Sequence, residues 1–150
     1  MPTIAELLVP MDGSPLSKAA LEVALDEYPE ASVTVLHVIN PAEPGYSYPI
    51  DVDPETEPLH GSEAWYDRAE SLADRLFDEV EELAEGYGAT VATEVVVGDP
   101  GRVIVTHAAE EPTDQIVIGS HGREDADQHL LGSVTETVVF RAPVRVLLVR

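Results

Sequence analysis

Glycines and hydroxyl side chains recur at a fixed spacing between residues 119 and 133, and this pattern suits a phosphate group. The segment reads Gly119-Ser120-His121-Gly122, then nine residues, then Gly132-Ser133. Glycine lets the backbone approach a ligand closely and adopt positive φ. An apolar run, 115–118, precedes the segment, and a helix-like run, 134–141, follows it. The unpaired N–H groups and positive dipole end of that helix would attract an anion.

Two further apolar runs end on residues that suit a ligand site. Residues 5–9 are followed by Pro10-Met11-Asp12-Gly13-Ser14, and residues 32–39 end on Val38-Ile39. In doubly wound sheets, ligands bind beyond the carboxyl ends of the strands. We therefore expect Pro10, Met11, Asp12 and Val38 to lie beside the glycine segment. Asp12 also has a simpler interpretation, because aspartate is favoured in ordinary turns.

Three polar side chains near the glycines each allow two interpretations. His121 faces either a ligand or solvent. Ser133 either contacts phosphate or caps the helix, since Ser133-Val134-Thr135-Glu136 has the form of a capping box. Arg123 either grips phosphate through its guanidinium or pairs with the neighbouring acids Glu124 and Asp127. The site that we predict includes all three residues.

The nine-residue spacer after Gly122 is acidic. It carries acids at positions 124, 125 and 127, close to the predicted phosphate site. Those acids weaken anion binding unless they point outward or help to hold a metal ion. His129 and these acids lack the spacing of a recognisable metal site. The spacer therefore bears on ligand affinity more than on the location of the site.

The sequence shows no arrangement that is typical of nucleophilic catalysis. It has no Gly-x-Ser-x-Gly segment, and its glycine loop lacks the lysine of a Walker motif. Positioned phosphate donors without a clear general base indicate binding more than catalysis. Slow hydrolysis stays open.

The charge of the chain limits its partners. Acidic residues number 29 against 8 basic ones, which gives a net charge of −21, and Lys18 is the only lysine. Such a surface repels nucleic acid and anionic membranes, so we expect neither as a partner. The charge fits either a moderately acidic protein or, as we favour, a halophilic protein from a salt-accumulating cytoplasm. About 1 M salt shortens the Debye length to about 3 Å and screens the self-repulsion.

The sequence lacks several features that are typical of secreted and membrane proteins. There is no cysteine, which excludes disulfides, thiolate catalysis and cysteine metal sites. No apolar run approaches about 18 residues, so we expect no transmembrane helix. The N-terminus does not resemble a secretory signal. We therefore expect a cytoplasmic protein.

Apolar β-rich runs alternate with helical patterns along the whole chain. We expect strands at 5–9, 32–39, 90–97, 115–118 and 145–149, and helices at 15–28, 62–85, from 100 and at 133–141. Strands that alternate with helices indicate an α/β fold. We predict an open, doubly wound, five-stranded parallel sheet with helices on both faces, in a single domain, 1–150. The run at 90–97 alternates most, so we expect it near an edge.

Residues 40–61 form the irregular part of the chain. They hold five prolines, and the segment is either a lid over the strand ends or a tolerated surface loop. After it, apolar residues from Trp65 to Leu83 fall three or four apart and predict a core-facing helix. We expect His37 in the core and His107 partly buried on a helix.

The chain resembles the universal stress protein family, of the nucleotide-binding kind. That family's pattern is Gly, two residues, Gly, nine residues, Gly, then Ser or Thr, which Gly119, Gly122, Gly132 and Ser133 reproduce. The matching flanks are 9–14, 36–38, 97–100 and 142–149. The resemblance covers essentially the whole chain.

The resemblance implies a Rossmann-like fold of the adenine nucleotide alpha hydrolase type that binds ATP, AMP or ADP with Mg²⁺ or Mn²⁺. It places Asp12 near the ribose and the phosphate-bound metal, and the backbone of Val38 at the adenine. The residues implied to wrap the ribose and phosphates are Gly119, His121, Gly122, Gly132, Ser133, Val134 and Thr135. It also implies a homodimer through the last strand, Arg145 to Val149, an apolar edge that suits pairing.

Three functions remain open. The leading one is an ATP-binding switch or sensor in stress response. A protein-interaction module of the same fold, without a physiological nucleotide, is the second. A slow ATPase is the third. The sequence does not identify a protein partner.

Overall fold

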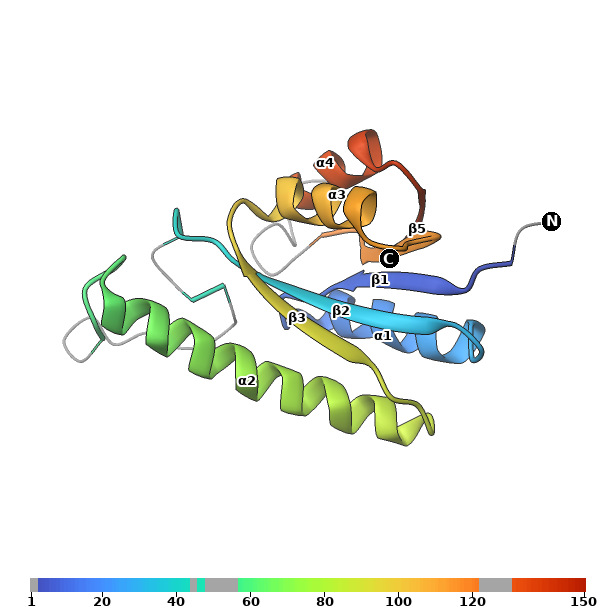
Figure 1. Cartoon of the computed structure of the whole chain (residues 1–150), viewed down its shortest axis with the longest axis horizontal. Helices are drawn as coiled ribbons and strands as arrows, with labels where there is room; N and C mark the ends of the chain where they lie inside the picture. The colour runs from blue at the N-terminus through green and yellow to red at the C-terminus, as the bar shows by residue number, and fades with distance from the viewer. Residues whose placement is uncertain (1–2, 44–45, 48–56, 122–130) are drawn as a thin grey trace.

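The computed structural model describes residues 3–43, 46–47, 57–121 and 131–150, and within them strands and helices alternate strictly (Figure 1). The strands are β1 (Glu6–Pro10), β2 (Ser32–Ile39), β3 (Ala92–Val97), β4 (Gln115–Gly119) and β5 (Arg145–Val149). The helices are α1 (Pro15–Glu27), α2 (Glu63–Gly86), α3 (Pro100–Glu110) and α4 (Ser133–Arg141). The predicted boundaries agree to within about two residues.

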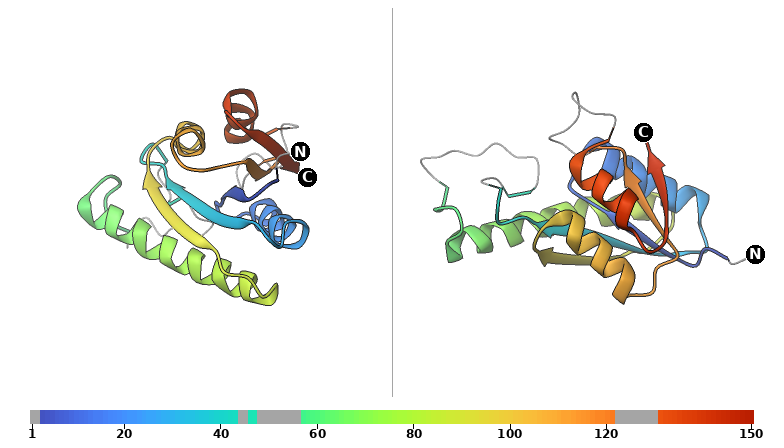
Figure 2. Two further views of the ribbon diagram at one scale, coloured as in Figure 1. Left: turned by 45° about the vertical axis from the view of Figure 1, so that its right-hand side comes forward. Right: turned by 90° about the horizontal axis from the view of Figure 1, so that it is seen from above.

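The five strands form one parallel sheet in the order β3-β2-β1-β4-β5. Helices α1 and α2 cover one face, and α3 and α4 cover the other, as both views of Figure 2 show. This arrangement confirms the predicted doubly wound α/β fold. The chain order reverses between β1 and β4, so the strand ends diverge there and leave room for a ligand.

The three central strands are apolar on both sides because each side meets a helix layer. In β1, Leu7 and Val9 pack into the cluster beneath α1 and α2, while Leu8 packs into the cluster beneath α3 and α4. The two outer strands are more exposed, with Val97 of β3 at 47%. The prediction that 90–97 lies near an edge is therefore confirmed.

Side chains at the helix starts explain most of the boundaries. Ser14, Ser62 and Asp99 are N-caps whose side chains accept hydrogen bonds from backbone N–H groups of α1, α2 and α3. At α4 the N-cap is Gly132, without a side-chain hydrogen bond. The capping-box prediction was therefore wrong. Ser133 is the first helical residue, one position too late to cap.

The predicted roles of the core residues are confirmed. Trp65, Leu72, Leu76 and Val80 are buried along one side of α2. His37 is 1% exposed, and His107 is partly buried on α3.

Among the described residues, no helix combines the length and apolarity needed to cross a bilayer.

Asp114 holds the start of β1 through hydrogen bonds and makes the stability of the fold sensitive to acid. Its Oδ2 accepts hydrogen bonds from the backbone N–H groups of Ala5, at 2.9 Å, and Glu6, at 2.8 Å. These two bonds, Ala5's first, lower the pKa of Asp114 from its ordinary value of 3.8. A lowered folded pKa stabilises the protein above pH 3.8, and this stability is lost as the pH falls through the lowered value.

We therefore expect Asp114→Asn to unfold at a lower urea concentration than the wild type at pH 7. The difference between the two should shrink as the pH falls below 3.8. Urea midpoints across a pH series measure it, with Asp26→Asn on exposed α1 surface as the charge-matched control. A difference that persists unchanged at low pH would contradict this origin.

Candidate functional site

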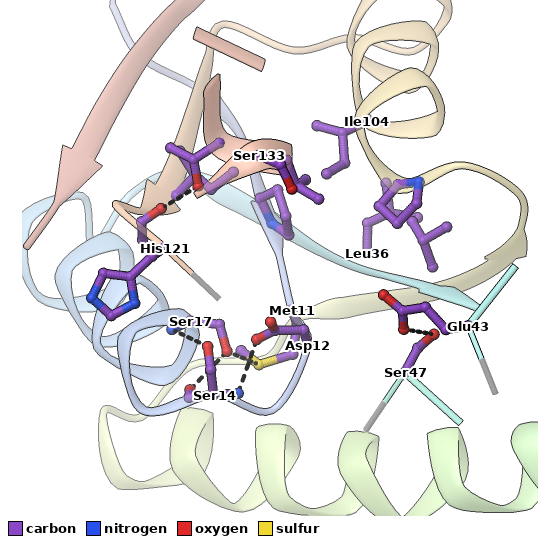
Figure 3. A pocket seen from close by; sticks show the side chains of 17 residues that line it. Met11, Asp12, Ser14, Ser17, Leu36, Glu43, Ser47, Ile104, His121 and Ser133 are labelled. Carbon is purple, nitrogen blue, oxygen red and sulfur yellow. Dashed lines mark hydrogen bonds between the residues drawn. The ribbon is translucent and has the colours of Figure 1, made fainter. Parts of the chain in front are cut away.

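A cavity of about 140 Å³ lies at the carboxyl edge of the sheet. The ends of β1, β2 and β4 form its floor, and the first turns of α1, α3 and α4 form its walls (Figure 3). Parallel strands followed by helices necessarily bring helix N-termini to this edge. The cavity is therefore surrounded by backbone N–H groups and the positive ends of three helix dipoles.

Most of the predicted site residues line this one cavity. They are Pro10, Met11, Asp12, Val38, Gly119, His121, Ser133, Val134 and Thr135. Gly132 is buried just before α4 and does not line the cavity. Gly122, Arg123 and the acids at 124, 125 and 127 lie outside the described residues.

The turn between β1 and α1 is built by Asp12 and the residues that follow it. Asp12 Oδ1 accepts a hydrogen bond from Ser14 N at 2.9 Å. Gly13 has a φ of 82°, a conformation that glycine adopts without strain. The turn interpretation of Asp12 is therefore confirmed. Asp12 also lines the cavity, which keeps its role at a ligand a prediction.

Buried polar contacts fix the floor of the cavity. His37 Nδ1 donates to the carbonyl of Met11 at 2.7 Å, which holds the end of β1 against β2. Ser17 Oγ lies 2.8 Å from Ser14 O and 3.1 Å from Met11 Sδ. Met11 therefore has a defined backbone and side-chain position.

The glycine segment is tied to α4 and α1 at close range. Thr135 Oγ1 donates to the Gly119 carbonyl at 2.8 Å, and Gly132 N donates to the Ser120 carbonyl at 2.8 Å. A Cβ on Gly119 would lie 2.8 Å from Leu16 Cβ and 3.2 Å from Leu16 backbone atoms. Gly119 is thus required for helix packing as well as suited to a ligand.

One half of the cavity is apolar, and sequence reasoning missed most of it. Leu36, Pro100, Ile104 and Ile118 line it, together with the predicted Val38. Pro100 and Ile104 come from α3, which follows the edge strand β3 and packs back over the sheet next to β2. The Asp99-Pro100 helix start was visible in the sequence, but its position above the cavity depends on the crossover.

Four other lining residues have side chains that can hydrogen-bond and were not among the predicted site residues: Ser14, Ser17, Glu43 and Ser47. Ser17 lies one helical turn after Ser14, so its place on the cavity side of α1 follows from helix geometry. Glu43 and Ser47 come from the irregular segment after β2, where no periodicity was available to place them.

An aromatic cluster supports that irregular segment from behind. Tyr46 stacks on Trp65 with ring centroids 5.5 Å apart, and both pack with Ile39 at the end of β2. Burial, with hydrogen bonding to Glu57, raises the pKa of Tyr46 to about 12, so the phenol stays neutral and donates to that carboxylate. Ser47, which directly follows Tyr46 and lines the cavity, is therefore held close to α2.

Within the described residues, the structure contains no group of three or more His, Asp or Glu side chains placed to hold a metal ion. Asp12 and Glu43 are the carboxylates that line the cavity in this part of the chain. Mg²⁺ is commonly held by one or two carboxylates together with substrate phosphates. These carboxylates fit a divalent metal ion that is bound to the phosphates of a ligand when it enters the cavity.

The chain matches the model of the universal stress protein family over residues 4–150. It is 31% identical to universal stress protein MJ0531 of Methanocaldococcus jannaschii, over 97% of this chain and 81% of the relative. It spans about half the length of the mycobacterial relatives that it matches at 35% identity.

Two solved structures show the same fold. Protein MJ0577 of Methanocaldococcus jannaschii superposes with a TM-score of 0.81 at 28% identity, over 99% of this chain and 96% of the other. A universal stress protein family member from Arabidopsis thaliana with AMP bound superposes with a TM-score of 0.66, over 97% and 90%. At 18% identity, the second likeness shows the fold alone.

Proposed function

The chain belongs to the universal stress protein family, and from this premise we propose that it binds ATP and acts as a nucleotide-loaded switch or sensor in cytoplasmic stress response. One observation carries the proposal. Three strand ends and three helix N-termini surround a single cavity that is apolar on one side and rich in N–H donors on the other.

Each half of the cavity suits one part of a nucleotide. Leu36, Pro100 and Ile104 offer an apolar surface for the base. On the other side, α4 begins at Ser133, and its first N–H groups and hydroxyl suit phosphate oxygens. Figure 3 shows His121 and Ser133 on that side, away from Glu43 and Ser47. The Arabidopsis thaliana protein that shares this fold has AMP bound.

A divalent ion, Mg²⁺ or Mn²⁺, fits the charge of the site. Asp12 is the residue that we propose to face it, directly or through water, with phosphate oxygens as its other ligands. When bound, the ion would neutralise phosphate charge. The chain's own residues would orient the nucleotide, with Leu36 and Ile104 against the base and the first turn of α4 against the phosphates.

The net charge of −21 makes this binding dependent on short-range contacts. Long-range attraction for a polyanion is absent, so N–H donors and the metal ion must hold it. We propose that the protein is adapted to a salt-rich cytoplasm, where screening removes the repulsion. Thermal melting across a salt series tests this adaptation, and undiminished stability in dilute buffer would oppose it.

Ser133→Glu is the variant that tests nucleotide binding most directly. A carboxylate at the first position of α4 suits the helix dipole, so the fold should be retained. It also places negative charge beside the proposed phosphate site, and about 4 Å between like charges costs roughly 1–4 kcal/mol. We expect ATP affinity with Mg²⁺ or Mn²⁺ to fall by about tenfold, as measured by isothermal titration.

Ser71→Glu is the matched control, because Ser71 is exposed on α2 outside the cavity. It adds the same charge and should leave the affinity unchanged. No heat from the wild type and no nucleotide retained on purification would overturn the proposed function. Equal losses in both variants would show that net charge, rather than the site, controls binding.

We also propose a homodimer that forms through the edge strand β5, Arg145–Val149. Its apolar residues are only partly buried in one chain, and Phe140, near the end of α4, is 78% exposed. An unpaired edge beside exposed apolar surface favours association. Sedimentation velocity at high salt measures the mass, and a monomer at all concentrations would overturn the dimer.

A further inference from the structure

A carboxylate forms the wall of the apolar half of the cavity. Glu43 and Ser47 line the cavity on the same side as Leu36 and Ile104, as Figure 3 shows. This is the half that suits a base, and Figure 3 shows the helix start at Ser133 away from Glu43 and Ser47. Glu43 and Ser47 therefore add a carboxylate and a hydroxyl beside the apolar residues Leu36 and Ile104.

Ser47 holds this carboxylate in a defined place. Its hydroxyl donates to Glu43 Oε2 at 3.1 Å and accepts a hydrogen bond from Asn40 N at 3.0 Å. Ser47 is 6% exposed and has a φ of 59°, the one positive φ of a non-glycine residue in the described part of the chain. A strained residue of this kind persists only where its surroundings fix it, and such residues cluster at binding sites.

The aromatic cluster of Tyr46 and Trp65 holds Ser47 in this conformation. Tyr46, next to Ser47, is 1% exposed and stacks on Trp65 of α2. The backbone before it is tied to the end of β2, because Asn40 directly follows that strand. Glu43 thus belongs to a wall that is built before any ligand arrives.

The chemistry of an ionised carboxylate determines what this wall can recognise. A carboxylate accepts hydrogen bonds and donates none. Adenine presents an amino group at its six-position, whereas a 6-oxopurine presents a carbonyl oxygen there. The carboxylate attracts the first group and repels the second.

We propose that Glu43 determines base specificity by accepting a hydrogen bond from the amino group of adenine, and that the cavity therefore rejects 6-oxopurine nucleotides. This inference rests on the proposed nucleotide binding. It adds a residue that selects among nucleotides with identical ribose and phosphates.

The test compares ATP with inosine triphosphate, in which a carbonyl oxygen replaces the six-amino group and N1 carries a proton, while the ribose and phosphates are the same. We expect the wild type to bind ATP at least tenfold more tightly, which is the order of a hydrogen bond to a charged group. Glu43→Gln should bring the two affinities close together, because an amide can accept from an amino group or donate to a carbonyl. Isothermal titration with Mg²⁺ at high salt measures both ligands.

Two further variants sharpen the result. Glu30→Gln removes the same charge from exposed surface and should keep the wild-type preference. Ser47→Gly removes the hydroxyl at a φ that glycine adopts freely, so the fold is retained while the preference falls. The glycine variant keeps the proposal testable if Glu43→Gln does not fold.

The outcomes separate the inference from the proposed function. If neither nucleotide binds the wild type, the proposed function fails. If both bind equally, or if Glu43→Gln keeps the full preference, nucleotide binding stands and the role of Glu43 is overturned. A preference that collapses in Glu43→Gln and persists in Glu30→Gln supports the inference.

Discussion

Replacing Trp65 by alanine is expected to lower the free energy of unfolding by about 3–5 kcal/mol, the usual cost of removing a large buried aromatic side chain. Trp65 is 1% exposed and contacts the rings of Tyr46, His60 and Tyr66. Its loss leaves a cavity between α2 and the end of β2. Urea unfolding followed by circular dichroism measures the change.

The substitution should also disturb ligand selection, because Trp65 supports the wall that carries Glu43 and Ser47. Trp65→Phe is the control. Trp65 Nε1 is buried and has no hydrogen-bond partner among the described residues, so phenylalanine forfeits no hydrogen bond there. We expect Trp65→Phe to cost about 1 kcal/mol. Equal losses in the two variants would show that the ring is not what anchors this wall.

Gly119→Ala is expected to cost about 1–3 kcal/mol, the typical penalty for forcing extra volume into a packed interior. The new methyl group would lie 2.8 Å from Leu16 Cβ and 3.2 Å from the Leu16 backbone. Backbone atoms in the first turn of α1 cannot turn away as a flexible side chain does. We expect α1 to shift from β4 and ATP affinity to fall with it.

Gly86→Ala is the matched control, since nothing lies within 4 Å of a Cβ added there. At this last residue of α2, alanine should raise stability by about 0.5–1 kcal/mol. Thermal or urea unfolding of both variants, together with titration of ATP, measures the contrast. Wild-type stability in Gly119→Ala would show that Leu16 has room to move.

The sequence predicted the strands, the helices and most of the cavity because the information is local. Apolar runs buried on both faces identify β1, β2 and β4, and their polar ends identify the edge where a ligand binds. The alternation of strands and helices then limits the topology to a few parallel arrangements. Pro10, Met11, Asp12 and Val38 could be placed together on this basis alone.

The sequence could not predict contacts that depend on how segments pack. Glu43 lines the cavity in a segment where Tyr46 stacks on Trp65, and no pattern in residues 40–61 indicates that stacking contact. Gly119 was expected to serve a ligand, but its closeness to Leu16 arises from helix packing. The N-cap of α4 falls on Gly132 because backbone geometry at the end of the glycine segment, rather than side-chain preference, starts that helix.

The central place of β1 in the sheet has a consequence for synthesis of the protein on the ribosome. This strand is made before the other four strands of the sheet, yet it pairs on one side with β4, and Glu6 at its start is bonded to Asp114, 108 residues later. Until β4 emerges from the exit tunnel, the nascent chain has an unpaired apolar edge at β1. The glycine segment and α4, which complete the cavity, are also made late. A nucleotide bound across all three strand ends can therefore stabilise only a nascent chain in which α4 has already been made.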